Sequence, residues 1–141
     1  MIAYLDTSSL VKLYVEEQGR TAVVALVERA DSIATSRITY AETRAALARL
    51  HRDRWLSAAA LKDCVTQLDE RWPGYRLVEV TEELVRRAGN LAERYALRGY
   101  DAVQLAAATE LRIAGADLVF SSFDARLNTA VRRERIRVAQ S

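Results

Sequence analysis

The sequence predicts an α/β fold in which a short central parallel sheet of about five strands is flanked by helices on both faces. Short apolar runs typical of buried strands alternate with longer segments whose apolar residues recur at helical spacing. The 141 residues include only five Gly and one Pro, and no repeat, low-complexity segment or linker composition divides them. A chain of this length suffices for one continuous core and is short for two, so we expect a single domain over residues 1–141.

Two strands and four helices are expected in the first half of the chain. The strands cover residues 2–5, which are apolar, and residues 32–35. The helices cover four segments: residues 8–16, 21–30, 38–52 and 58–72. Ser57 is placed to cap the last of these helices and Pro73 to end it, because Ser is a favoured N-cap and Pro cannot continue a helix.

Three strands and three helices are expected in the second half. The strands cover residues 76–80, 117–120 and, at an edge of the sheet, 136–138. The helices cover three segments: residues 81–95, 100–114 and 125–131. Gly99 separates the first two of these helices and Gly115 ends the second, as glycines at helix ends commonly do.

Composition favours a cytoplasmic protein that does not enter membranes. Half of the residues are hydrophobic and 28% are charged, which is an ordinary globular balance. No apolar run approaches the roughly 20 residues that a membrane span needs. The N-terminal residues lack the basic and apolar regions of a secretory signal. Cys64 is the single cysteine, so no internal disulfide can form, which suits a reducing compartment.

Arginine dominates the basic residues. Nineteen of the 21 Lys and Arg residues are Arg, although the net charge is only +2. Four of them lie close together near the C-terminus: Arg132, Arg133, Arg135 and Arg137. Arg binds phosphate in a planar, bidentate way, so a patch facing RNA or DNA is one interpretation. The other is a solvated helix end in a protein whose codons favour Arg.

An acid stands where the first strand meets the first helix, in the stretch MIAYLDTSSLVKLY. Asp6 follows the predicted strand directly, and ligands of parallel α/β sheets bind at the carboxyl ends of strands. Asp is also a favoured helix N-cap. Because Thr7 or Ser8 would serve as a cap equally well, the cap does not require an acid, and both interpretations stay open.

Three further acids are expected at the same edge of the sheet. Glu42 lies early in the helix over residues 38–52, where the alternatives are a surface ion pair with Arg44 or Arg49 and a favourable first-turn charge. Asp101 lies near the start of an almost wholly apolar helix, YDAVQLAAA, where the alternatives are a helix-start charge and an ion pair with Arg98. Asp124 follows the strand over residues 117–120, and a plain N-cap is its alternative. Asp117 lies at the other end of that strand and is left out.

Four carboxylates in one cleft repel one another and raise one another's pKa values unless a cation offsets their charge. Ligation by oxygen alone favours Mg²⁺ or Mn²⁺. A zinc site is not expected, because His51 is the only His and Cys64 the only Cys.

Four segments of the chain resemble the PIN domain, most closely that of VapC-type toxins of prokaryotic toxin–antitoxin pairs. They are IAYLDTSSLVKLY, SRITYAETRAAL, LRGYDAVQLAAA and DLVFSSFDARL. The resemblance spans essentially the whole chain, and the first and third segments are the most specific. It implies the PIN-like form of the α/β fold, with Asp6, Glu42, Asp101 and Asp124 as catalytic and metal-ligating residues.

The resemblance also implies an activity, a cofactor and partners. The activity is Mg²⁺- or Mn²⁺-dependent endoribonuclease cleavage of tRNA or ribosomal RNA, which blocks translation. A VapB-type antitoxin neutralises such toxins, and they are commonly homodimers. Thr7 and Ser122 match hydroxyl residues beside the acids and are expected to orient a carboxylate or a water. Gln104 stands where the family often has His, which leaves the ligands intact and affects only substrate details or a local hydrogen bond.

Three alternatives to the ribonuclease remain. The chain is also compatible with a non-catalytic module that binds RNA or protein on the same fold, or with a DNA-directed nuclease. Aspartyl phosphorylation on Asp6 is disfavoured, since Ser8 stands where a phosphatase of the dehalogenase kind has a second acid. Divalent-metal binding separates the active nuclease from the non-catalytic module.

Overall fold

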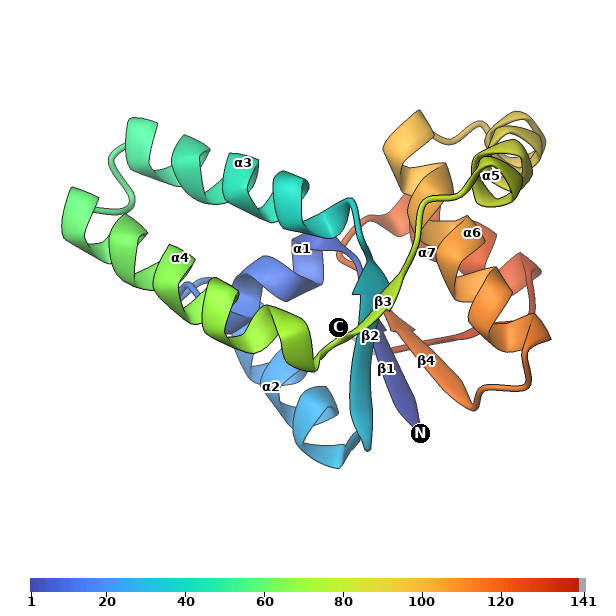
Figure 1. Cartoon of the computed structure of the whole chain (residues 1–141), viewed down its shortest axis with the longest axis horizontal. Helices are drawn as coiled ribbons and strands as arrows, with labels where there is room; N and C mark the ends of the chain where they lie inside the picture. Colours follow the sequence, from blue (N-terminus) through green and yellow to red (C-terminus); the bar gives the residue numbers. More distant parts are fainter. Residues whose placement is uncertain (140–141) are drawn as a thin grey trace.

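A parallel sheet of five strands forms the centre of the protein (Figure 1). The computed structural model describes residues 1–139. The strand order is β3-β2-β1-β4-β5, and all four pairings are parallel. The strands are β1 (Ile2–Leu5), β2 (Ser32–Ser36), β3 (Arg76–Val78), β4 (Leu118–Ser121) and β5 (Arg137–Val138). The predicted parallel α/β fold, with its last strand at an edge, is therefore confirmed.

Helices cover both faces of this sheet (Figure 1). The first group is α1 (Thr7–Leu10), the 3-10 helix η1 (Val11–Leu13), α2 (Arg20–Arg29), α3 (Thr39–Arg52) and α4 (Ala58–Arg71). The second group is α5 (Glu82–Tyr95), α6 (Gly99–Ile113) and α7 (Ala125–Arg133). In the described chain, none of the helices is long and apolar enough to cross a membrane.

The central strand β1 is buried on both faces, which explains its uninterrupted apolar sequence. Ala3 and Leu5 pack into the core beneath the first group of helices, whereas Ile2 and Tyr4 pack into the core beneath the second. Successive side chains of a strand point to opposite faces, so a strand between two helical layers needs apolar residues at every position. The Tyr4 ring stacks on Phe120 of β4 at 5.1 Å between centroids.

The predicted helix over residues 8–16 is wrong in extent. The α-helix ends at Leu10, and η1 then tightens the chain over Val11–Leu13. The reason is burial: residues 10 and 11 and residues 13–15 are all buried in one core. An amphipathic surface helix has a polar face that this run lacks.

Two further boundaries differ from the prediction. The strand predicted over residues 76–80 stops at Val78, because Glu79 turns outward to pair with Arg37. Gly99 does not separate two helices but is the first residue of α6. The preceding helix ends instead at Ala96, which has the left-handed conformation (φ 53°) usual for a C-terminal cap.

Candidate active site

The four predicted acids lie at the carboxyl edge of the sheet, on four different elements. Asp6 follows β1 and caps α1, Glu42 lies in the first turn of α3, Asp101 lies in the first turn of α6, and Asp124 caps α7. Burial is the largest cause of the raised pKa of Asp6, Glu42 and Asp101; beyond it, the charge of Asp101 raises the pKa of Asp6 and Glu42, and the charge of Asp124 raises that of Asp101. The four acids therefore share one edge of the sheet, and the other three each interact electrostatically with Asp101.

Asp6 is the most buried of the four, with 4% of its surface exposed. Its Oδ1 accepts hydrogen bonds from the backbone N–H of Ser9 (3.0 Å) and the hydroxyl of Ser8 (2.7 Å). Burial raises the pKa of Asp6 to about 6, although hydrogen bonds from Ser122, Ser8 and Ser9 act in the opposite direction. Asp6 is thus the helix cap that one interpretation predicted, and the charge of Asp101 adds a smaller effect to its raised pKa.

Glu42 is held by two donors from other elements. Its Oε1 accepts from the hydroxyl of Thr7 (2.9 Å) and from Nε2 of Gln104 (3.0 Å). Burial raises the pKa of this half-buried carboxylate, and the charge of Asp101 adds to the effect. The predicted surface ion pair is wrong, because Arg44 contacts Tyr40 and Arg49 pairs with Asp53, whereas the alternative of a first-turn charge is confirmed.

Gln104 connects the buried core to the site, a role that the sequence did not suggest. Only 2% of its surface is exposed. Its Oε1 accepts from the Tyr4 hydroxyl (2.7 Å), and its Nε2 donates to Thr39 (2.9 Å) as well as to Glu42. The signal in the sequence was an amide within an otherwise apolar helix, since a buried amide must find hydrogen-bonding partners.

Asp101 and Asp124 lie nearer the surface. Burial is the largest cause of the raised pKa of Asp101, the charge of Asp124 is the next, and Arg98 acts against both. Arg98 and Asp101 form no ion pair within 4 Å among the residues described. Asp124 accepts from the backbone N–H of Leu127 at 3.0 Å, so the predicted N-cap is present.

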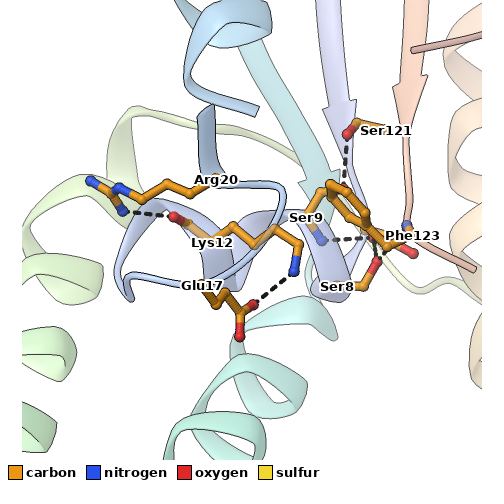
Figure 2. A network of polar contacts seen from close by, with 8 residues as sticks. Ser8, Ser9, Lys12, Glu17, Arg20, Ser121 and Phe123 are labelled. Carbon is orange, nitrogen blue, oxygen red and sulfur yellow. Dashed lines mark hydrogen bonds and ion pairs between the residues drawn. The ribbon is translucent and has the colours of Figure 1, made fainter. Parts of the chain in front are cut away.

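Serine hydroxyls join α1 to the segment that links β4 to α7 (Figure 2). Ser8 donates to Asp6 and accepts from the backbone N–H of Phe123 at 2.9 Å. The hydroxyls of Ser9 and Ser121 lie 2.8 Å apart. Ser122 accepts from the backbone N–H of Asp124 at 3.0 Å and also contacts Asp6. Two of the site acids are therefore positioned by one hydroxyl network.

The ring of Phe123 also holds the segment between β4 and α7 in place, through its contact with Lys12 (Figure 2). Lys12, which pairs with Glu17, lies 4.4 Å above the ring centroid. Gly19 lies beneath the ring edge, where an added Cβ would approach Phe123 to 2.6 Å. Gly19 also has φ of +94°, a conformation that other residues rarely adopt. This arrangement explains why a glycine stands at that turn.

The donor chemistry fits a hard divalent cation. None of the nine ion pairs within residues 1–139 involves any of the four acids. A buried carboxylate without a cation is costly, and carboxylate oxygens suit Mg²⁺ or Mn²⁺. In this conformation the acids stand apart, because within the described chain no three Asp, Glu, His or Cys side chains are grouped closely enough to hold an ion.

Comparison with known proteins places the chain in a family. The PIN domain model matches residues 3–132, so the chain belongs to the PIN-domain family. Within it, the chain is homologous to the VapC ribonuclease toxins. It is 38% identical to ribonuclease VapC45 of Mycobacterium tuberculosis over 138 residues, which cover 98% of this chain and 94% of that protein.

Solved structures show the same fold at lower sequence identity. FitAcB from Neisseria gonorrhoeae superposes with a TM-score of 0.72 at 19% identity, covering 99% of this chain and 97% of that one. A toxin–antitoxin complex from Klebsiella pneumoniae gives a TM-score of 0.66 at 20% identity, covering 89% of each chain. The predicted family and its PIN-like fold are confirmed.

Proposed function

We propose that this protein is a Mg²⁺- or Mn²⁺-dependent endoribonuclease and the toxin of a toxin–antitoxin pair. The observation that carries the proposal is a set of four acids without cations at one sheet edge, including the buried Asp6. The same chain is 38% identical to a protein named as a ribonuclease. Structural RNAs of translation, tRNA or ribosomal RNA, are the proposed substrates, and the cytoplasm is where the protein would meet them.

The proposed reaction is hydrolysis of a phosphodiester. Water attacks phosphorus in line, the bond from phosphorus to the 3′ oxygen breaks, and that oxygen takes up a proton. The products are a 5′-phosphate and a 3′-hydroxyl, and the RNA 2′-hydroxyl takes no part as a nucleophile. When bound, the divalent ion lowers the pKa of a water and offsets negative charge in the transition state.

The side chains of the site divide into ligands and groups that position them. Asp6 and Asp101 are the principal ligands, because Asp6 is buried at the strand end and Asp101 interacts with all the other acids. Glu42 and Asp124 complete the set. Thr7 holds Glu42 by its hydrogen bond. Ser122 joins Asp6 to the backbone of Asp124 and so keeps these two ligands in register.

The first experiment is cleavage of end-labelled tRNA and ribosomal RNA by protein freed of any co-purifying antitoxin. Mg²⁺, Mn²⁺ or EDTA is present, and the Asp101→Asn variant is assayed beside the wild type. Discrete cuts that need metal and vanish in the variant support the proposal. Binding of Mn²⁺ without cleavage of RNA would favour a DNA-directed nuclease. Neither binding nor cleavage would favour the non-catalytic module.

Two partners complete the proposal. A VapB-type antitoxin is proposed because VapC proteins are similar over 98% of this chain and because one structural neighbour is a toxin–antitoxin complex. A homodimer is proposed from the family resemblance, and size-exclusion chromatography with light scattering measures it. Co-expression with the protein encoded beside this toxin should suppress cleavage and yield a stable complex.

A further inference from the structure

An aromatic residue directly precedes two of the site acids, and the two aromatic side chains have opposite surroundings. Phe123, before Asp124, is 36% exposed, and its ring contacts Lys12 on one face (Figure 2) and Gly19 at its edge. Tyr100, before Asp101, has 63% of its surface exposed. Within residues 1–139 its hydroxyl makes no hydrogen bond, and its ring stacks on no other aromatic and under no cation. Tyr100 thus presents an exposed aromatic ring in the same first turn of α6 that carries Asp101.

Two arginines near the start of α6 have no ion-pair partners among the described residues. Arg98, two positions earlier, is exposed and close enough to Asp101 to lower the pKa of that acid. Arg126, in the first turn of α7, is exposed and donates to the carbonyl of Ala96 at 3.5 Å. This bond places its guanidinium against the turn that leads into α6. The α6–α7 side of the site therefore combines positive charge with a free aromatic ring.

We propose that Tyr100 is a platform on which an unpaired base of the RNA substrate stacks next to the cleaved phosphate. Arg98 and Arg126 contact the flanking phosphates. The inference rests on the proposed ribonuclease function and adds the class of substrate to it.

Two physical reasons favour this occupant. A base stacks on an exposed aromatic ring in a sequence-tolerant way, since every base has a π face. The acids of the site repel the RNA backbone, so cations at the rim are needed to hold it. A base inside a duplex already stacks on its neighbours, so a ring at this position selects single-stranded segments or loops over helices.

The test compares three variants on short single-stranded RNA oligonucleotides that the wild type cleaves. Tyr100→Ala removes the ring, and Tyr100→Phe keeps it. Ile113→Ala is the matched control, since Ile113 is 62% exposed at the far end of the same helix. Loss of stacking on one base in Tyr100→Ala should raise KM, and the dissociation constant measured in EDTA, by about five- to 150-fold. The value of kcat should change little. Tyr100→Phe and Ile113→Ala should behave as the wild type.

A second comparison isolates the base that stacks. Oligonucleotides carry an abasic site at one position at a time around the cleavage site. At the stacked position, loss of the base should weaken wild-type binding but leave Tyr100→Ala unaffected, because the ring that would meet the base is already absent. At every other position the two proteins should respond alike.

Several outcomes would overturn the inference. Unchanged KM and affinity for Tyr100→Ala would refute it and leave the ribonuclease proposal standing, since wild-type cleavage is measured in the same assay. Equal losses on duplex and single-stranded RNA would exclude stacking. Weaker antitoxin binding with unchanged RNA binding would make Tyr100 a protein contact. If the wild type cleaves no RNA, both proposals fail together.

Discussion

The two edges of the sheet carry acids of the same type in opposite electrostatic states. At the amino edge, Asp31 pairs with the N-terminal ammonium and Asp117 pairs with Arg137, and these acids are exposed. The ammonium lowers the pKa of Asp31. At the carboxyl edge, Asp6 and the other three site acids form no ion pair within the described residues, and burial raises the pKa of Asp6 to about 6. Unpaired and partly buried acids therefore distinguish the candidate site from ordinary surface charge, and they fit the cation that we propose for it.

The largest expected effect is loss of cleavage in Asp101→Asn. Asp101 interacts with the other three acids, so removing its charge removes the centre of the ion site. We expect kcat in Mg²⁺ to fall by at least about 100-fold, because a metal supplies several kcal/mol of charge stabilisation. The isosteric change keeps the fold, which circular dichroism checks. Asp117→Asn at the opposite edge is the control and should cleave normally.

The next largest effect is expected for Gln104, whose hydrogen bonds link the buried Tyr4 to Glu42. Gln104→Leu removes the acceptor of the Tyr4 hydroxyl and one of the two donors that Thr39 and Glu42 each have. Such loss of buried partners costs about 1–3 kcal/mol of unfolding free energy, and loss of support for a ligand lowers metal affinity by about 10- to 100-fold. Urea unfolding and Mn²⁺ titration measure the two effects.

Gln104→His tests the same contact by rescue, since the family often has His at this position. An imidazole nitrogen can replace the amide donor, so this variant should retain most of the activity and metal affinity. If Gln104→Leu and Gln104→His lose activity equally, a hydrogen bond to Glu42 is not what this position supplies.

Stability in the absence of metal should depend on pH in the direction that Asp6 sets. The folded-state pKa of about 6 exceeds the unfolded value of 3.8, so the folded state holds the proton more tightly. Metal-free protein therefore loses stability as pH rises from about 4 to 7, by up to about 3 kcal/mol from this group.

Urea unfolding in EDTA at pH 5 and pH 8 measures about half of this loss, because the unfolded carboxyl is already mostly ionised at pH 5, and the Asp6→Asn variant isolates the contribution of the group. Mg²⁺ should restore stability more at pH 8 than at pH 5, because only the ionised carboxylate binds it. A wild type and an Asp6→Asn variant with parallel pH profiles would show that burial of this acid carries no free-energy cost.

The fold and the placement of Asp6 and Asp124 at one sheet edge were predictable because both follow from short-range patterns. Apolar runs such as residues 2–5 predict strands of a sheet covered on both faces, and the carboxyl ends of parallel strands share an edge. The role of Gln104 was not predictable, since its partners Tyr4 and Glu42 are distant in sequence. The early end of α1 also depended on tertiary burial, which overrides helical spacing.

The smallest effect is expected at the amino edge, from removing the ion pair between Asp117 and Arg137. Asp117 and Arg137 are about two-thirds exposed, and exposed ion pairs contribute little because water and salt screen them. Asp117→Asn should shift the melting temperature by less than about 3 °C, and 1 M NaCl should abolish the difference. Its cleavage of RNA and its Mn²⁺ affinity should equal those of the wild type. If Asp117→Asn instead impaired cleavage as strongly as Asp101→Asn, charge balance would not distinguish the two edges, and the assignment of the site would lose its electrostatic basis.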